Sequence, residues 1–375
     1  MLEPFIYEYN GIKSLENIQV KIMKILQNRI YVALFVALAA TVFLQTQDAQ
    51  ALDTISEYIR EYPNQEQAKM MNAWLKKHEK GTFNFTGLVD PNDATVVSPQ
   101  ATVDYGYNWF SISDGPAIVK CPRYDKFFSV SIFDMKHNTP AVIVNPDKPV
   151  LIKRPGQKLP EGDYYVVELE TDQGLVFTRM VVIDNMEKVR ELSKQFVMEG
   201  GKGDMTRNVQ RFSPAIEKRA MAVIDAVVPL PDTCFGKKSG DVDFLALAFC
   251  VRIGQLGTPA DTVRYFAQST DDDDQPLKGD ATYTVTVPAG LVQDKGYYSV
   301  TVYGTDNKLL IPNDKKIYDR TTYTSKQNED GTYTLTLSPS GEGENGIPTG
   351  KDFYAILRAY LPKPGAAMRL KIKKQ

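Results

Sequence analysis

Histidine is scarce in this chain of 375 residues, which has only His78 and His137. A zinc site built from several imidazoles, such as a three-histidine site, is therefore excluded, whereas a site with mixed ligands is merely unsupported. The sequence also lacks the Gly-x-Ser-x-Gly turn of many hydrolases, a phosphate-binding glycine-rich loop and the His-Glu-x-x-His zinc motif. The catalytic signatures that can be read from a short stretch of sequence are therefore missing.

Neither sign of charge is in excess. The chain has 44 Lys and Arg against 46 Asp and Glu, which gives a formal net charge of −2. Nucleic-acid binding requires a strongly basic face. Nucleic acid is therefore not expected as a partner.

Cysteine is also sparse, with Cys121, Cys234 and Cys250 as the only three. In an exported protein an odd number leaves one free thiol or an intermolecular bond. A pair between Cys234 and Cys250 is one alternative. The other is a free Cys250 packed inside an apolar helical stretch, as unpaired cysteines often are.

Long hydrophobic runs are missing except near the N-terminus. Met23–Arg29 forms a basic head, Ile30–Leu44 is almost entirely apolar, and Ala49-Gln50-Ala51 follows. The apolar run has about 15 residues, whereas a membrane span needs roughly 20. This layout is typical of a secretory signal peptide.

We therefore predict a signal peptide over residues 23–51, with cleavage after Ala51. Residues 1–22 are then a non-native upstream extension, and a retained membrane anchor is the alternative interpretation. The mature chain is expected to be periplasmic or secreted, with no membrane span.

Changes in hydrophobic periodicity divide the rest of the chain into four parts. Residues 52–95 have apolar side chains at helical spacing, and Pro63 is expected to split them into two helices. Residues 96–184 alternate in short strands with turn signals about every 8–12 residues, a pattern typical of a sandwich. Residues 185–265 are predicted to be a helical linker, and residues 266–375 return to strands. The predicted fold class is mainly β with helical segments.

One strand pair is predicted in more detail. Tyr164–Glu170 and Leu175–Ile183 are both strand-like, and they flank the turn-forming Thr171–Gly174. This spacing predicts a β-hairpin.

The stretch Val97–Pro116, together with the strands that follow it, resembles the opening motif of a bacterial family known as domain of unknown function 1254. The matching positions are Ser98, Pro99, Tyr105, Ser113, Gly115, Pro116, Pro122, Tyr124, Phe128, Ser129, Val130 and Asp134. The resemblance implies an immunoglobulin-like β-sandwich over residues 96–184.

The C-terminal part resembles a second family, domain of unknown function 1214. The motif positions are Asp274, Pro276, Leu277, Gly279, Tyr283, Val285, Pro288, Ala289, Gly290, Tyr297–Thr301, Tyr303, Phe353, Leu357, Arg358, Tyr360 and Pro362. This resemblance implies a jelly-roll-like sandwich over residues 266–375. At Gly346 the chain lacks an aromatic residue that the family favours, so a ligand contact there is not carried over.

The aromatic strand in the first motif offers a candidate ligand platform. Alternation places Tyr105, Tyr107 and Trp109 on one face and Asn108 on the other. Exposed rings beside an amide suit a stacked ligand such as a sugar. The alternative is that this face is core, and on that interpretation Trp109 lies inside the N-terminal sandwich.

Two further residues are weighed as site residues. His137 could act as a general base oriented by Asp134, or it could be a surface turn residue. Arg358 could anchor a ligand or form a buried ion pair.

Four consecutive carboxylates, Asp271, Asp272, Asp273 and Asp274, are the only metal-site candidates. Clustered carboxylates suit Ca²⁺, but the spacing matches no EF-hand loop. A solvated acidic loop is the preferred interpretation, so no metal and no cofactor are expected.

Two classes of function remain. The first is an exported, non-catalytic envelope module for binding or assembly, with a homo-oligomer and a glycan or small ligand as candidate partners. The second is an exported hydrolase or lyase that uses carboxylate and Tyr residues at the seam between the domains. Carboxylate pairs leave no local sequence signature, so the sequence does not decide whether the chain is an enzyme.

Overall fold

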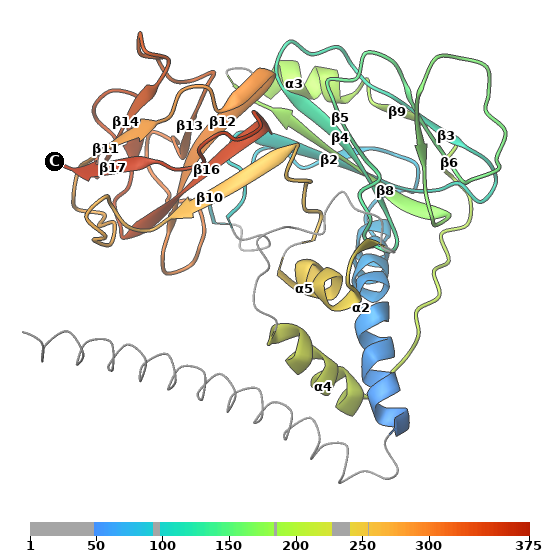
Figure 1. Cartoon of the computed structure of the whole chain (residues 1–375). Coiled ribbons are helices and arrows are strands. Elements are labelled where there is room, and N and C mark those ends of the chain that lie inside the picture. Colours follow the sequence, from blue (N-terminus) through green and yellow to red (C-terminus); the bar gives the residue numbers. More distant parts are fainter. Residues whose placement is uncertain (1–48, 93–97, 184–185, 227–240, 254) are drawn as a thin grey trace, which may run out of the picture. The chain divides into compact units, whose positions relative to one another are not determined.

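The computed structural model describes residues 49–92, 98–183, 186–226, 241–253 and 255–375. The chain forms two compact units. The smaller comprises Met1–Tyr58 and Phe212–Ala222, and the larger comprises Ile59–Arg211 and Val223–Gln375. Both β-sandwiches belong to the larger unit (Figure 1).

The first sandwich packs a five-stranded sheet against a four-stranded one. The five-stranded sheet has the order β1-β2-β8-β4-β5 and the other has the order β7-β6-β3-β9. Inward side chains such as Phe110, Val130 and Ile152 are fully buried between them. The strands are β1 (Asn84–Phe85), β2 (Val103–Ser111), β3 (Ala117–Lys120), β4 (Phe128–Asp134), β5 (Ala141–Val144), β6 (Val150–Lys153), β7 (Tyr165–Glu168), β8 (Gln173–Val181) and β9 (Val197–Glu199).

The predicted hairpin at Thr171–Gly174 is wrong. β7 pairs in parallel with β6, whereas β8 pairs with β2 and β4 in the opposite sheet. Both strands are apolar because they face the same core from opposite sides, and a single-sequence pattern does not distinguish this arrangement from a hairpin.

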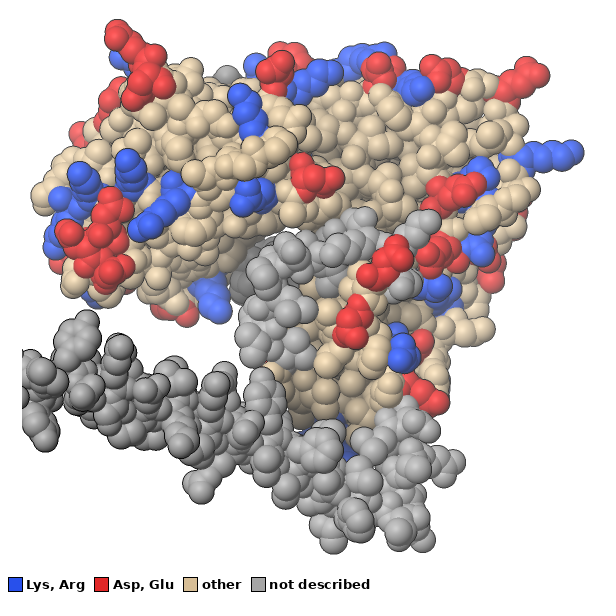
Figure 2. Space-filling view, in the orientation of Figure 1, with Lys and Arg blue, Asp and Glu red and all other residues tan. Residues whose placement is uncertain are grey.

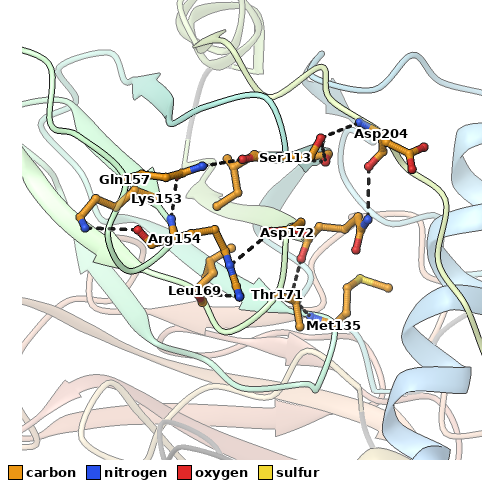
Figure 3. A network of polar contacts seen from close by, with 12 residues as sticks. Ser113, Met135, Lys153, Arg154, Gln157, Leu169, Thr171, Asp172 and Asp204 are labelled. Carbon is orange, nitrogen blue, oxygen red and sulfur yellow. Dashed lines mark hydrogen bonds and ion pairs between the residues drawn. The ribbon is translucent and has the colours of Figure 1, made fainter.

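Polar contacts hold this crossover between the sheets (Figure 3). Arg154 bonds the carbonyl oxygen of Leu169 through Nη1 at 3.1 Å and pairs with Asp172 through Nε at 3.2 Å. The Thr171 hydroxyl accepts a hydrogen bond from the Met135 amide at 3.0 Å. The segment between β7 and β8 is therefore tied to both sheets.

Helix α2 (Ala49–Leu75) is continuous, so the predicted break at Pro63 is also wrong. Met71 is fully buried, and Trp74 contacts Tyr107 and Trp109 on the outer face of the five-stranded sheet. Packing of this kind can hold a helix together where proline removes one backbone hydrogen bond.

The second sandwich packs two four-stranded sheets against each other. Their orders are β10-β16-β12-β13 and β15-β14-β11-β17. The core between them includes Tyr283, Val300, Leu335 and Phe353, all essentially buried. The strands are β10 (Val263–Gln268), β11 (Tyr283–Val287), β12 (Val292–Gly304), β13 (Asp319–Thr321), β14 (Tyr333–Ser338), β15 (Ile347–Pro348), β16 (Phe353–Pro362) and β17 (Lys371–Lys374).

Among the described residues between β8 and β10 there are three helices: α3 (Met186–Ser193), α4 (Pro214–Asp225) and α5 (Phe244–Ile253). β9 also lies in the part predicted to be a linker, and it pairs with β3 of the first sandwich. The predicted fold class, mainly β with two sandwiches and helical segments between them, is confirmed.

The predictions for residues 1–48 lie outside the described residues, as does Cys234. Cys250 is disulfide-bonded and Cys121 is free. In the part of the chain that is described, no helix is both long and apolar enough to cross a membrane.

Candidate binding groove between the two sandwiches

The two sandwiches meet through a cluster of aromatic rings. The rings of Tyr297 and Tyr360 stack with centroids 4.3 Å apart and an interplanar angle of 6°. Phe127 of the first sandwich lies 5.1 Å from the Tyr297 ring and 5.2 Å from the Tyr360 ring. All three side chains are buried, so the sandwiches share a small apolar core at the seam.

Next to these rings, the first motif of the chain is bound to the second sandwich. Arg358 donates from Nη2 to the carbonyl oxygen of Ser98 at 2.8 Å, and Tyr303 donates to the carbonyl oxygen of Pro99 at 2.6 Å. The hydroxyls of Ser98 and Tyr354 are 2.7 Å apart. These contacts, and the hydrogen bonds that Gln100 makes to the second sandwich, are called the Ser98–Gln100 latch.

Gln100 extends the latch to a buried carboxylate. Its Oε1 accepts from the hydroxyls of Ser299 at 3.3 Å and Thr301 at 3.4 Å. Asp319 accepts a hydrogen bond from Thr102 at 2.9 Å. Burial raises the pKa of Asp319 to about 6, although the Thr102 hydrogen bond and the charge of Arg358 oppose the shift.

A groove of about 870 Å³ opens at the same seam, with both sandwiches contributing to its walls. Its size is within the range of about 300–1,000 Å³ usual for ligand sites. The first sandwich and α3 supply Pro122–Phe128, Asn145–Asp147 and Lys188, and the second supplies Asp294–Gly296, Thr322 and Tyr323.

Two tyrosines of the groove are fixed by backbone contacts. Tyr124 donates to the carbonyl oxygen of Val181 at 2.6 Å, and Tyr323 accepts from the amide of Phe127 at 3.1 Å. Asn145 holds the loop Tyr124–Lys126 in place, because its Nδ2 donates to the carbonyl oxygens of Tyr124 and Lys126. The groove wall is therefore held in place without a ligand.

Charged side chains of both signs line the groove. The Lys126 ammonium lies 5.4 Å from the Tyr323 ring centre, and the Lys188 ammonium lies 6.0 Å from that of Tyr124. Asp125 pairs with both lysines, at 3.7 Å and 3.5 Å. Desolvation, the largest single effect, raises the pKa of Asp125, but a backbone hydrogen bond and the charges of Lys188 and Lys126 together lower it below its ordinary value.

Family models cover both halves of the groove. Residues 81–200 match the family described as Protein of unknown function (DUF1254), and residues 262–364 match Protein of unknown function (DUF1214). The chain therefore matches both family models in tandem, DUF1254 before DUF1214. The resemblance of both parts to these families, in this order, is confirmed.

Two solved structures are similar to this DUF1254–DUF1214 chain. The crystal structure of the VPA0106 protein from Vibrio parahaemolyticus has 20% sequence identity and a TM-score of 0.71, covering 87% of this chain and 100% of its own. An uncharacterized protein from Burkholderia cenocepacia has 11% identity and a TM-score of 0.46, over 87% and 95% of the two chains. The first supports the fold alone. No curated protein matches the sequence significantly.

The aromatic strand β2 of the DUF1254 domain lies outside the groove. As predicted, Tyr105, Tyr107 and Trp109 share one face, and that face packs toward α2 and Phe177. Trp109 is only 3% exposed, but it lies between helix and sheet rather than inside the sandwich, where Asn108 is fully buried. Ligand contact at the half-buried Tyr105 and Tyr107 stays a prediction.

His137 is buried rather than on a surface turn. Its Nε2 accepts a hydrogen bond from the Leu256 amide at 3.2 Å, and burial lowers the pKa of the imidazole to about 4. The Asp134 carboxylate accepts hydrogen bonds from the amides of Lys136 and Asn138 and from the Asn138 side chain. A neutral, enclosed histidine with so low a pKa is poorly suited to act as a general base near pH 7.

The four consecutive aspartates of the DUF1214 domain form a folded turn. Asp271 is 5% exposed, and its Oδ1 accepts from the amides of Asp273 and Gln275. Asp272 bonds Ile372 of β17 in both directions, at 2.8 Å and 3.1 Å. Within the described ranges there is no cluster of three or more His, Cys, Asp or Glu that could hold a metal ion.

Arg358 lies in the latch at the seam, but none of the predicted site residues lines the groove. Arg358 is 4% exposed and bonded within the latch. Lys126, Lys188 and Lys295 come from a loop, from helix α3 and from strand β12, and they carry no local signal. Of the groove residues, Pro122, Tyr124 and Phe128 belong to a motif, and that motif could have directed attention to this loop.

Proposed function

We propose that this DUF1254–DUF1214 chain is an exported, non-catalytic binding module that holds a glycan or other small polar ligand in the groove between its sandwiches. The supporting observation is the groove itself, because both family domains contribute to one hollow of about 870 Å³. Its lining combines tyrosine rings with donors and acceptors, the combination that orients polar ligands.

Two of the three carboxylates that line the groove, Asp125 and Asp147, favour binding over hydrolysis. A glycosidase needs one carboxylic acid with a raised pKa to protonate the leaving group. The pKa of Asp125 is lowered, and the pKa of Asp147 is lowered by a hydrogen bond from Tyr165 and by the charges of Arg123 and Lys148. Both acids are therefore ionised at neutral pH, and as carboxylates they can accept hydrogen bonds from the hydroxyl groups of a ligand.

A thermal-shift screen of the chain without residues 1–51 tests the proposal. Neutral and acidic oligosaccharides are the probes, because a ligand that binds the native state raises the melting temperature by mass action. We expect stabilisation by at least one glycan, and its loss in a Lys188→Ala/Lys295→Ala variant. The matched control is Lys371→Ala/Lys373→Ala in β17, two exposed lysines outside the groove. A shift that survives in the groove variant would contradict the proposal, as would no shift with any glycan.

A further inference from the structure

The groove continues beyond the hollow described above. A second hollow of about 410 Å³ is lined by Gln293, Asp294, Lys295, Leu361 and Lys363. Asp294 and Lys295 line both hollows, so the two adjoin at these side chains. Each hollow alone is large enough for a small-ligand site.

An irregularity in β12 creates this junction. Val292 pairs with Pro362 and Tyr297 pairs with Tyr360, so β12 contains three more residues than β16 between these pairs. The extra residues project from the sheet as a bulge, a device that often re-aims side chains beside binding sites.

The bulge ends at Gly296, where any other residue would require the neighbouring backbone to move. A Cβ atom at Gly296 would lie 2.3 Å from the carbonyl oxygen of Tyr360 and 3.0 Å from Cβ of Val292. The first contact is with backbone, so a side chain here would force the two strands apart. The exposed Asp294 and Lys295 are thus placed between the two hollows by the strand pairing itself.

Cations outnumber carboxylates along the combined groove. Five basic residues line it against three acidic ones, although the whole chain has a net charge of −2. Asp125 is already paired with Lys126 and Lys188. The basic residues are Arg123, Lys126, Lys188, Lys295 and Lys363, and the acidic ones are Asp125, Asp147 and Asp294.

We infer that the two hollows together bind one continuous stretch of an acidic polysaccharide, with Lys295 contacting a carboxylate at the junction and Lys363 a carboxylate further along. This inference rests on the proposed function and specifies its ligand. Sugar hydroxyl groups can donate to Asp147 and Asp294, whereas a phosphate backbone would meet three carboxylates in the same groove. The mixed lining therefore favours a uronate chain over a nucleic acid.

Calorimetry with purified oligouronates of two to eight sugar units tests this inference. Affinity should rise by about tenfold or more from the dimer to the longest chain, because only long chains reach both hollows. Neutral oligosaccharides of equal length should bind more weakly. Each exposed lysine–carboxylate contact contributes modestly, so Lys363→Ala should weaken the longest chain about two- to fivefold and leave the dimer unchanged. Lys373→Ala in β17 is the control and should change neither.

The outcomes separate the two proposals. If short and long chains, or acidic and neutral ones, bind equally well, the extended acidic ligand is wrong while the binding groove stands. If a single-stranded oligonucleotide binds more tightly than the oligouronates, the ligand class is wrong. If no oligosaccharide binds at any length, the proposed function fails as well.

Discussion

The guanidinium of Arg358 and the carbonyl oxygen of Ser98 are joined by a 2.8 Å hydrogen bond between residues 260 positions apart in the chain. Each belongs to the motif of a different family. Arg358 also bonds the hydroxyl of Thr301 at 3.2 Å, and it is buried. Motif residues from both families therefore take part in joining the two sandwiches.

Removing this guanidinium should loosen the junction between the sandwiches. Arg358→Met leaves the Ser98 carbonyl oxygen without its donor, and a buried unpaired group costs about 1–3 kcal/mol. It also removes the charged donor to the Thr301 hydroxyl, which keeps only its bond to Gln100. We expect a loss of roughly 2–5 kcal/mol in the free energy of unfolding. Chemical denaturation followed by circular dichroism measures it. Arg358→Lys keeps the charge but not the forked geometry and should recover only part of the loss. An unchanged midpoint for Arg358→Met would contradict a role in the latch.

Asp319 should make stability depend on pH. Its pKa is about 6 in the folded chain against an ordinary value of 3.8, so the folded state retains a proton that the unfolded state loses. The stabilisation of the folded state by this retained proton is fully present below pH 4. It falls as pH rises from about 4 to 6, and the free energy of unfolding no longer changes through Asp319 above that window. Asp319→Asn removes this titration. The variant should therefore gain stability relative to the unmodified chain between pH 4 and pH 7, by up to about 3 kcal/mol.

Denaturant melts at several pH values check this prediction. The exposed Asp314→Asn serves as the control, and its effect should stay within about 0.5 kcal/mol at every pH. A flat difference between Asp319→Asn and the unmodified chain would show that Asp319 does not titrate in this window.

Trp109 should be a structural residue of the helix–sheet layer. Its ring lies 5.9 Å from that of Trp74 and is buried with Phe133 and Leu175. Trp109→Ala should cost about 3–5 kcal/mol, as usual for a large core side chain. Trp109→Phe should cost much less, because the indole Nε1 has no hydrogen-bond partner among the described residues. Loss of ligand binding with unchanged stability in Trp109→Ala would instead support the ligand platform.

The Cys121 thiol should react slowly in the folded chain. Burial raises its pKa to about 12, so very little thiolate exists at neutral pH. We expect negligible reaction with a disulfide reagent in the native chain. In denaturant without reductant one thiol should react, because Cys250 is disulfide-bonded. Rapid labelling of Cys121 under native conditions, found by peptide mapping, would contradict the prediction.

The sequence predicted the parts of the fold that depend on local pattern. Alternation in β2 assigned Tyr107 and Asn108 to opposite faces correctly, because the two-residue period of side chains is fixed by strand geometry. The same reasoning failed at Thr171–Gly174, since a strand that crosses to the opposite sheet is as apolar as one that returns beside it. It failed at Pro63 because packing of α2 against the sheet outweighed a local break.

The groove could not be predicted in the same way. Tyr124 and Tyr323 are about 200 positions apart in the sequence, and nothing local relates them. The bulge at Gln293–Gly296 interrupts a strand pattern without a motif, and its role emerges only from the pairing of β12 with β16. Such sites depend on which loops meet in three dimensions, and a single sequence holds no direct record of that.

The latch also sets an order of events during synthesis. A ribosome adds about 5–20 residues per second and releases the N-terminal sandwich first. Ser98 then waits roughly 13–50 s for Arg358, which comes 260 residues later. During that interval Phe127 and the backbone carbonyls of Ser98 and Pro99 have no partner sandwich to cover them. A chain interrupted before β16 would therefore keep this surface open, because Tyr360 and Arg358 of that strand are among the residues that cover it.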